Sequence, residues 1–191
     1  MKKKSVSCLI FIISAFILMS MSVSAFDYKE NDVVIDFLPG DLNCDNRVTS
    51  ADARICLRAA ADLETLTEKQ KQIADFDGTG EIDSSAARKI LRASAEIEQI
   101  SYTVNLSENS RIVVGPYQNP GVYRWNCSTD FSDATIELHL EDDIPPEVVK
   151  LYDTVFTIGT QKTDNFTVSM VQQCPWNGKI WNSYELNIVF T

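Results

Sequence analysis

Oxygen-bearing side chains stand at a spacing that suits a calcium ion in residues 41–52. Ca²⁺ binds about six to eight oxygen atoms, and a loop of about 12 residues can wrap around one ion to supply them. The seventh loop position contributes only its backbone carbonyl, so an arginine is tolerated there. Asn46, at the sixth position, accepts the sharp turn that glycine usually makes. The predicted ligands of this first site are Asp41, Asn43, Asp45, Arg47 and Asp52, with Thr49 at the ninth position.

A second loop of the same kind begins 34 residues later, with a poorer set of ligands. Threonine replaces the acid at its fifth position, and Ala86 replaces the carboxylate at its twelfth. Because two charged ligand groups are lost, we expect a competent first site and a weak or empty second one. The predicted ligands of the second site are Asp75, Asp77, Thr79, Glu81 and Asp83.

The segment Cys174-Pro175-Trp176 raises three possibilities: a nucleophile, half of a disulfide, or the tip of a binding loop. A thiol nucleophile needs a neighbouring base, and the only histidine of the chain is His139. Ile136, Leu138 and Leu140 alternate with polar residues, which predicts that His139 lies on the solvent-facing side of a strand. An enzyme is therefore not expected.

Two similar helices are predicted to follow the two loops. Six of 11 positions are identical between residues 53–63 and 87–97, and both segments are rich in Ala, Leu and Arg and lack Pro and Gly. Residues 67–74 are predicted to form a short connecting helix, with Thr65 or Thr67 as its N-cap.

This duplicated loop–helix unit, residues 35–100, resembles the dockerin modules of cellulosomes. The resemblance implies a small all-α module with EF-hand-like loops that binds two Ca²⁺ ions and docks on a cohesin module of a scaffoldin. It also implies that loop positions 10 and 11 and helix positions 17 and 18 recognise the cohesin. These positions hold Ser50, Ala51, Leu57 and Arg58 in the first copy, and Ser84, Ser85, Leu91 and Arg92 in the second.

The N-terminus is predicted to be a signal peptide, residues 1–25. Three lysines precede an apolar run from Cys8 to Met19, and small residues lead to Ala25. A retained membrane anchor is the alternative. Removing the three lysines from 17 basic residues leaves 14 against 27 acidic ones, a net charge of −13. So acidic a chain disfavours nucleic acids and anionic membranes as partners, and we expect a secreted, scaffold-bound protein.

Four cysteines remain after the signal peptide is removed: Cys44, Cys56, Cys127 and Cys174. An exported protein can form disulfides, and four cysteines allow three pairings, which the sequence leaves open. One of these pairings contains a bridge between Cys127 and Cys174.

The C-terminal half, residues 101–191, is predicted to be all-β. Short runs rich in β-branched and aromatic residues are separated by turn signals such as Asn-Pro-Gly and Asn-Gly. About seven such strands are typical of an immunoglobulin-like sandwich. Trp125 is expected in its core, whereas Trp176 and Trp181 are expected to be exposed. The predicted strands are 102–106, 111–114, 123–127, 135–141, 155–158, 166–171 and 184–190.

This half resembles the chagasin-like inhibitors of papain-type cysteine proteases, which insert three loops from one end of a sandwich into the enzyme cleft. The resemblance is carried by Asn-Pro-Gly, by a glycine before a later strand, and by Pro-Trp near the C-terminus, where cysteine replaces the family's arginine. It implies protease-binding loops at Asn119, Pro120 and Gly121, at Gly159 and Thr160, and at Cys174, Pro175 and Trp176.

Two functions follow for the expected dockerin-bearing protein. The first is inhibition or binding of a papain-like cysteine protease on a scaffoldin. The alternative is a carbohydrate-binding module in which Trp176, Trp181 and Tyr184 stack on sugar rings.

Overall fold

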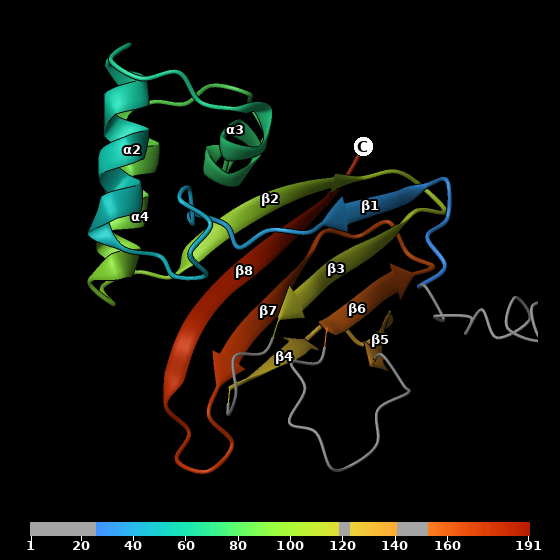
Figure 1. Ribbon diagram of the computed structural model, residues 1–191. Helices are drawn as coiled ribbons and strands as arrows, with labels where there is room; N and C mark the ends of the chain where they lie inside the picture. Colours follow the sequence, from blue (N-terminus) through green and yellow to red (C-terminus); the bar gives the residue numbers. More distant parts are fainter. Residues whose placement is uncertain (1–25, 119–122, 141–152) are drawn as a thin grey trace, which may run out of the picture.

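The computed structural model describes residues 26–118, 123–140 and 153–191. The predicted signal peptide and the expected loop residues Asn119, Pro120 and Gly121 lie outside the described residues. The described part consists of a helical unit beside two four-stranded sheets (Figure 1). The predicted division into a helical segment and a β-rich remainder is confirmed.

Three helices form where capping residues precede amphipathic runs. Thr49 and Thr67 each cap the following helix through reciprocal hydrogen bonds with its third residue, and Asp83 accepts two backbone N–H bonds at the start of the last helix. The first and last helices pack together, with Cys56 and Ile90 fully buried. These helices are α2 (Ser50–Ala60), α3 (Glu68–Ala74) and α4 (Ser84–Ser94).

The β-rich part is built from two sheets that enclose an apolar core. Each of the seven predicted strands is present, and alternate residues such as Ile112, Val168 and Leu186 are fully buried between the sheets. One sheet has the order β2 (Ile100–Leu106), β8 (Ile180–Phe190), β7 (Phe166–Gln173) and β4 (Arg124–Thr129). The other has the order β1 (Asp32–Ile35), β3 (Arg111–Gln118), β6 (Asp153–Thr160) and β5 (Ala134–Leu140).

Strand β1 precedes the helical unit, and sequence reasoning missed it. It pairs in parallel with β3, and β2 pairs in parallel with β8, whereas the other pairings are antiparallel. The chain therefore enters one sheet at β1, forms the helical unit, and returns to the other sheet at β2. A run as short as Asp32–Ile35 carries too little periodicity to be recognised in sequence.

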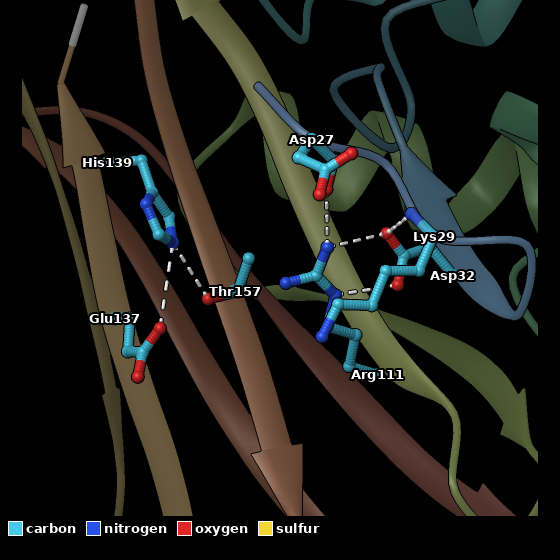
Figure 2. Close-up of polar contacts among 7 residues, drawn as sticks. All are labelled: Asp27, Lys29, Asp32, Arg111, Glu137, His139 and Thr157. Atoms are coloured by element: carbon cyan, nitrogen blue, oxygen red, sulfur yellow. Dashed lines mark hydrogen bonds and ion pairs between the residues drawn. The ribbon is translucent and has the colours of Figure 1, made fainter. Parts of the chain in front are cut away.

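A bidentate ion pair joins β1 to β3. The Arg111 guanidinium donates to both carboxylate oxygens of Asp32, at 2.7 and 2.9 Å, and also to the backbone carbonyl of Asp27 (Figure 2). This hydrogen bonding holds the pKa of the Asp32 carboxyl below its ordinary value. The Asp32 side chain is only 2% exposed, so its charge depends on this partner.

Replacing Arg111 by alanine is expected to lower the free energy of unfolding by about 2 kcal/mol, because the Asp32 carboxylate keeps its burial and loses its counter-charge. Urea unfolding followed by circular dichroism measures the change. Lys162→Ala is the matched control, since its ion pair with Asp133 lies at the surface of the same sandwich. Equal losses in the two variants would contradict the prediction.

The helical unit packs directly on the sandwich. The backbone N–H of Thr103 donates to the Phe76 carbonyl at 2.9 Å, and the Tyr102 hydroxyl lies 3.1 Å from the Gln72 carbonyl. Gly40, with φ of 88°, lies so close to β2 that a Cβ there would stand 2.5 Å from the Ile100 side chain. Buried residues of both parts consequently form one continuous apolar cluster.

Candidate functional site

The first predicted calcium loop is folded around its own carboxylates. Asp52 is fully buried and accepts hydrogen bonds from the backbone N–H groups of Asn43, at 3.1 Å, and Thr49, at 2.8 Å. Asp41 is also buried and accepts from the backbone of Asp45 and Asn46. The two ends of the loop are thereby drawn together, which is the arrangement that oxygen coordination of a single cation needs.

The backbone of this loop turns where the sequence predicted. Asn46, at the sixth position, has φ of 65°, and Cys44, at the fourth, has φ of 58°. In the second loop the same two positions are Gly78 and Gly80, with φ of 72° and 78°. The two loops therefore make the same left-handed turns at their fourth and sixth positions, although cysteine and asparagine replace glycine in the first.

Burial of acidic groups makes the first loop suited to a cation. The pKa of Asp41 is raised to about 6, chiefly by burial, with a smaller contribution from the carboxylates of Asp52 and Asp45 and against the opposing effect of the backbone hydrogen bonds. Carboxylates held this close repel one another in the ionised state until a positive charge neutralises them. The residues present fit a divalent cation with oxygen ligands.

The second loop retains part of this arrangement. Asp75 offers one oxygen to the backbone of Gly80, and its other oxygen is a buried acceptor with no hydrogen-bond partner among the described residues. Such an orphaned oxygen suits a metal ligand. Asp83, however, uses one oxygen to cap α4 through the backbone of Ser85 and Ala86, and the twelfth position supplies no carboxylate.

Restoring that carboxylate tests the predicted difference in calcium affinity between the two sites. Ala86 is the third residue of α4, as Asp52 is the third residue of α2. We expect Ala86→Asp to strengthen calcium binding at the second site by roughly tenfold or more, because it adds a charged ligand at the bidentate position. Isothermal titration calorimetry measures both sites. Ser85→Asp adds the same charge one residue away, and an equal gain in that variant would contradict the prediction.

The residues expected to recognise a cohesin lie on the surface of α2 and α4. Leu57 and Leu91, at equivalent positions, are about half exposed despite being apolar. Arg58 and Arg92, the residues that follow them, form equivalent ion pairs with Glu64 and Glu98. Of the remaining predicted residues, Ala51 is half-buried, and Ser50, Ser84 and Ser85 are exposed.

The hairpin between β7 and β8 presents one large aromatic side chain to solvent. Trp176 is 74% exposed at its tip. The backbone N–H of Cys174 donates to the Lys179 carbonyl at 2.9 Å, and that of Gly178 donates back to the Cys174 carbonyl at 2.8 Å. Cys174 itself is buried at the base of the hairpin. The turn is therefore closed by its own hydrogen bonds and carries an unpacked tryptophan.

The prediction that Gly159 and Thr160 lie in a loop beside Trp176 is wrong. Both residues belong to β6, where they pair with Thr135 and Ala134 of β5. Strand β6 runs away from the end that carries the β7–β8 hairpin, so the connection after Thr160 lies at the opposite end of the sandwich (Figure 1). The direction of a strand follows from pairing between distant segments, and a local Gly-Thr motif does not contain it.

The possible bridge between Cys127 and Cys174 is not formed. Cys127 pairs across the sheet with Met170, four residues before Cys174 on β7 and its extension. Four residues of strand span about 13 Å, beyond the roughly 7 Å that a disulfide allows between Cα atoms. The four cysteines of the described part of the chain are free thiols, and burial raises the pKa of Cys127 to about 12.

The aromatic platform expected for a sugar-binding surface is also absent from the described residues. Tyr184 is fully buried and packs against Trp125, at 5.8 Å between ring centroids. Trp181 was expected to be exposed but is half-buried, with the Arg47 guanidinium on its ring and Tyr123 beside it. Only Trp176 of the three proposed stacking residues is freely accessible, so the three do not form one exposed aromatic surface.

His139 lies on the outer face of β5, as predicted. Its Nε2 atom is 3.0 Å from the Thr157 hydroxyl and 3.8 Å from the Glu137 carboxylate (Figure 2), and its ring packs edge-on against Phe26. Strand β5 belongs to the sheet that does not contain β7, the strand that leads to Cys174. Leu138, predicted to face the core, is instead 52% exposed at this edge strand of its sheet.

Comparison with known proteins assigns the helical part of the chain. Residues 39–91 match the dockerin type I domain, which confirms the dockerin predicted from the duplicated loops. The chain thus contains a dockerin type I module. No curated protein matches the sequence. Within the described residues, no helix is both long and apolar enough to cross a membrane.

Two solved structures resemble the chain weakly. The cysteine protease inhibitor EhICP2 from Entamoeba histolytica has 14% identity and a TM-score of 0.37, over 47% of this chain and 84% of that one. Amebosin has 12% identity and a TM-score of 0.36, over 47% of this chain and 88% of that one. The first is a cysteine protease inhibitor, but TM-scores this low assign no function to the sandwich.

Proposed function

We propose that this protein is a secreted, non-catalytic component of a cellulosome that inhibits or binds a papain-like cysteine protease. Its dockerin docks on a scaffoldin cohesin through α2 and α4, and its sandwich presents the β7–β8 hairpin to the protease. The observation that carries the protease proposal is the 74% exposed Trp176 at the tip of a turn closed by its own hydrogen bonds.

The physical basis of inhibition is preorganisation. Pro175 restricts the backbone before Trp176, and the hydrogen bonds at Cys174 and Gly178 close the turn. A large aromatic side chain on such a turn can fill a cleft with little loss of conformational entropy, and tryptophans of this kind dominate many interfaces. Because Gly159 and Thr160 lie at the other end of the sandwich, they are not part of this proposed surface.

Calcium is the proposed cofactor of the dockerin. Asp41, Asn43, Asp45 and Asp52, with the Arg47 carbonyl, would hold the first ion, and the set Asp75, Asp77, Thr79, Glu81 and Asp83 would hold a second ion more weakly. When bound, the ion neutralises the converging carboxylates and fixes the ends of α2 and α4 that begin at these loops.

The protease proposal is tested by titrating papain with the mature chain, residues 26–191, in saturating calcium. We expect competitive inhibition at a stoichiometry of one to one. If the chain neither inhibits nor binds papain at micromolar concentration, the proposal is overturned. A parallel titration with a type I cohesin, with and without a calcium chelator, tests the docking proposal separately, so that each can fail alone.

A further inference from the structure

We propose that the sandwich forms part of the first calcium site, with Trp181 and Asn182 of β8 acting as positioning residues for the calcium loop. The inference rests on the proposed binding of calcium by that loop. It concerns residues about 135 positions away in the sequence, outside the helical unit altogether.

Asn182 holds the loop by a direct hydrogen bond. Its side-chain amide donates to the Asn46 carbonyl at 3.0 Å and to the Gln172 side-chain oxygen at 2.8 Å. Asn182 and Gln172 are both buried and face each other across β7 and β8. The donor is therefore fixed by the sheet before it meets the loop, and both of its N–H groups are used.

The Trp181 ring holds Arg47, the next residue of the loop, by its guanidinium group. The Arg47 guanidinium lies 4.6 Å from the centre of the Trp181 ring, which in turn packs against Tyr123 at 4.7 Å. A cation at this distance from an indole face is attracted by the ring's charge distribution. This contact explains why Trp181 is half-buried, and it gives a role to an arginine that calcium coordination alone would only tolerate.

The two contacts act directly beside the peptide unit that matters for coordination. Asn46 is the sixth residue of the loop and Arg47 the seventh, whose backbone carbonyl is the expected ligand. With the Asn46 carbonyl and the Arg47 side chain both held, the Arg47 carbonyl has little freedom to turn away from the ion. A loop ordered in advance loses less conformational entropy on binding, which strengthens affinity.

The second loop meets the sandwich differently. Its seventh residue is Glu81, which cannot form a cation–aromatic contact, and among the described residues no atom beyond its chain neighbours lies within 4 Å of where a Cβ of Gly80 would stand. The sandwich thus contacts the second loop at its second residue, through the bond from the Thr103 N–H to the Phe76 carbonyl, whereas it contacts the first loop at the residues beside the expected carbonyl ligand. This difference adds to the difference already present in the ligands of the two loops.

Calcium titration of the full mature chain by calorimetry tests the inference. We expect Trp181→Ala and Arg47→Ala each to weaken the tight site by about threefold to tenfold, and the double variant to lose no more than either one. Trp181→Phe keeps an aromatic face and should stay within about threefold of the wild type. Trp176→Ala removes a tryptophan from the same hairpin without touching the loop and should leave calcium affinity unchanged.

Because linkage is reciprocal, calcium should also slow amide hydrogen exchange in residues 180–183 of the wild type, and less so in Arg47→Ala. Wild-type affinity in both single variants, or losses that simply add in the double variant, would overturn the inference. A wild type with no tight site would instead overturn the calcium proposal itself. If Trp181→Ala does not fold, Arg47→Ala decides alone, because the Arg47 side chain is exposed.

Discussion

Replacing Asp52 by asparagine is expected to weaken calcium binding at the first site by roughly 100-fold and to abolish cohesin docking at calcium concentrations that saturate the wild type. Asp52 is the twelfth loop residue and the only carboxylate that joins the loop to the first turn of α2. Asparagine keeps the shape and one acceptor, so most of the effect comes from the lost charge and the lost bidentate contact.

Calorimetry with calcium and pull-down on an immobilised cohesin measure the two effects. Glu68→Gln is the matched control, since it removes the same charge from the exposed start of α3. Asp52→Asn also weakens the capping of α2, where Asp52 accepts from the Thr49 backbone, so unfolding of the calcium-free protein must be measured beside it. Retained docking in a folded, calcium-free variant would refute the prediction.

Replacing Trp176 by alanine is expected to weaken inhibition of a papain-like protease by about 30-fold or more. Truncation of a central aromatic residue in an interface removes about 2 kcal/mol or more of binding free energy. The same change should alter the free energy of unfolding by less than about 0.5 kcal/mol, because the side chain is largely in solvent.

The inhibition constant and the urea midpoint are measured on the same preparations. Trp176→Phe should retain part of the affinity, and Leu63→Ala, which removes an exposed apolar side chain from the helical unit, should retain all of it. A loss of inhibition matched by a loss of stability would mean that Trp176 supports the hairpin, and would contradict its role as a contact residue.

The helices, the strands and the turns of the two duplicated loops were predictable because their signals are local. Thr67 was recognised as a possible N-cap, and the repeat between residues 53–63 and 87–97 identified two equivalent helices. The positive φ of Asn46 followed from the needs of a tight loop around one ion. In each case neighbours within a few residues decide the outcome, through capping, side-chain periodicity or the reach of a short loop.

The partners of these elements were not predictable, because they depend on contacts between distant segments. Strand β1 gains its place from its pairing with β3 and from Arg111, which lies 79 residues after Asp32. Gly159 and Thr160 were assigned to the wrong end of the sandwich, since a motif does not reveal the direction in which its strand runs.

Trp181 shows most clearly the difference between what local sequence predicts and what distant contacts decide. Its position beside an Asn-Gly turn predicted an exposed ring, whereas its real surroundings include the loop of residues 41–52, which lies more than 130 residues earlier in the sequence. Amino-acid order thus sets the local conformations and the ligand set of each loop. Only the packing of the whole chain decides where the sandwich contacts each loop, because apolar burial and hydrogen bonding are shared among all the elements that meet.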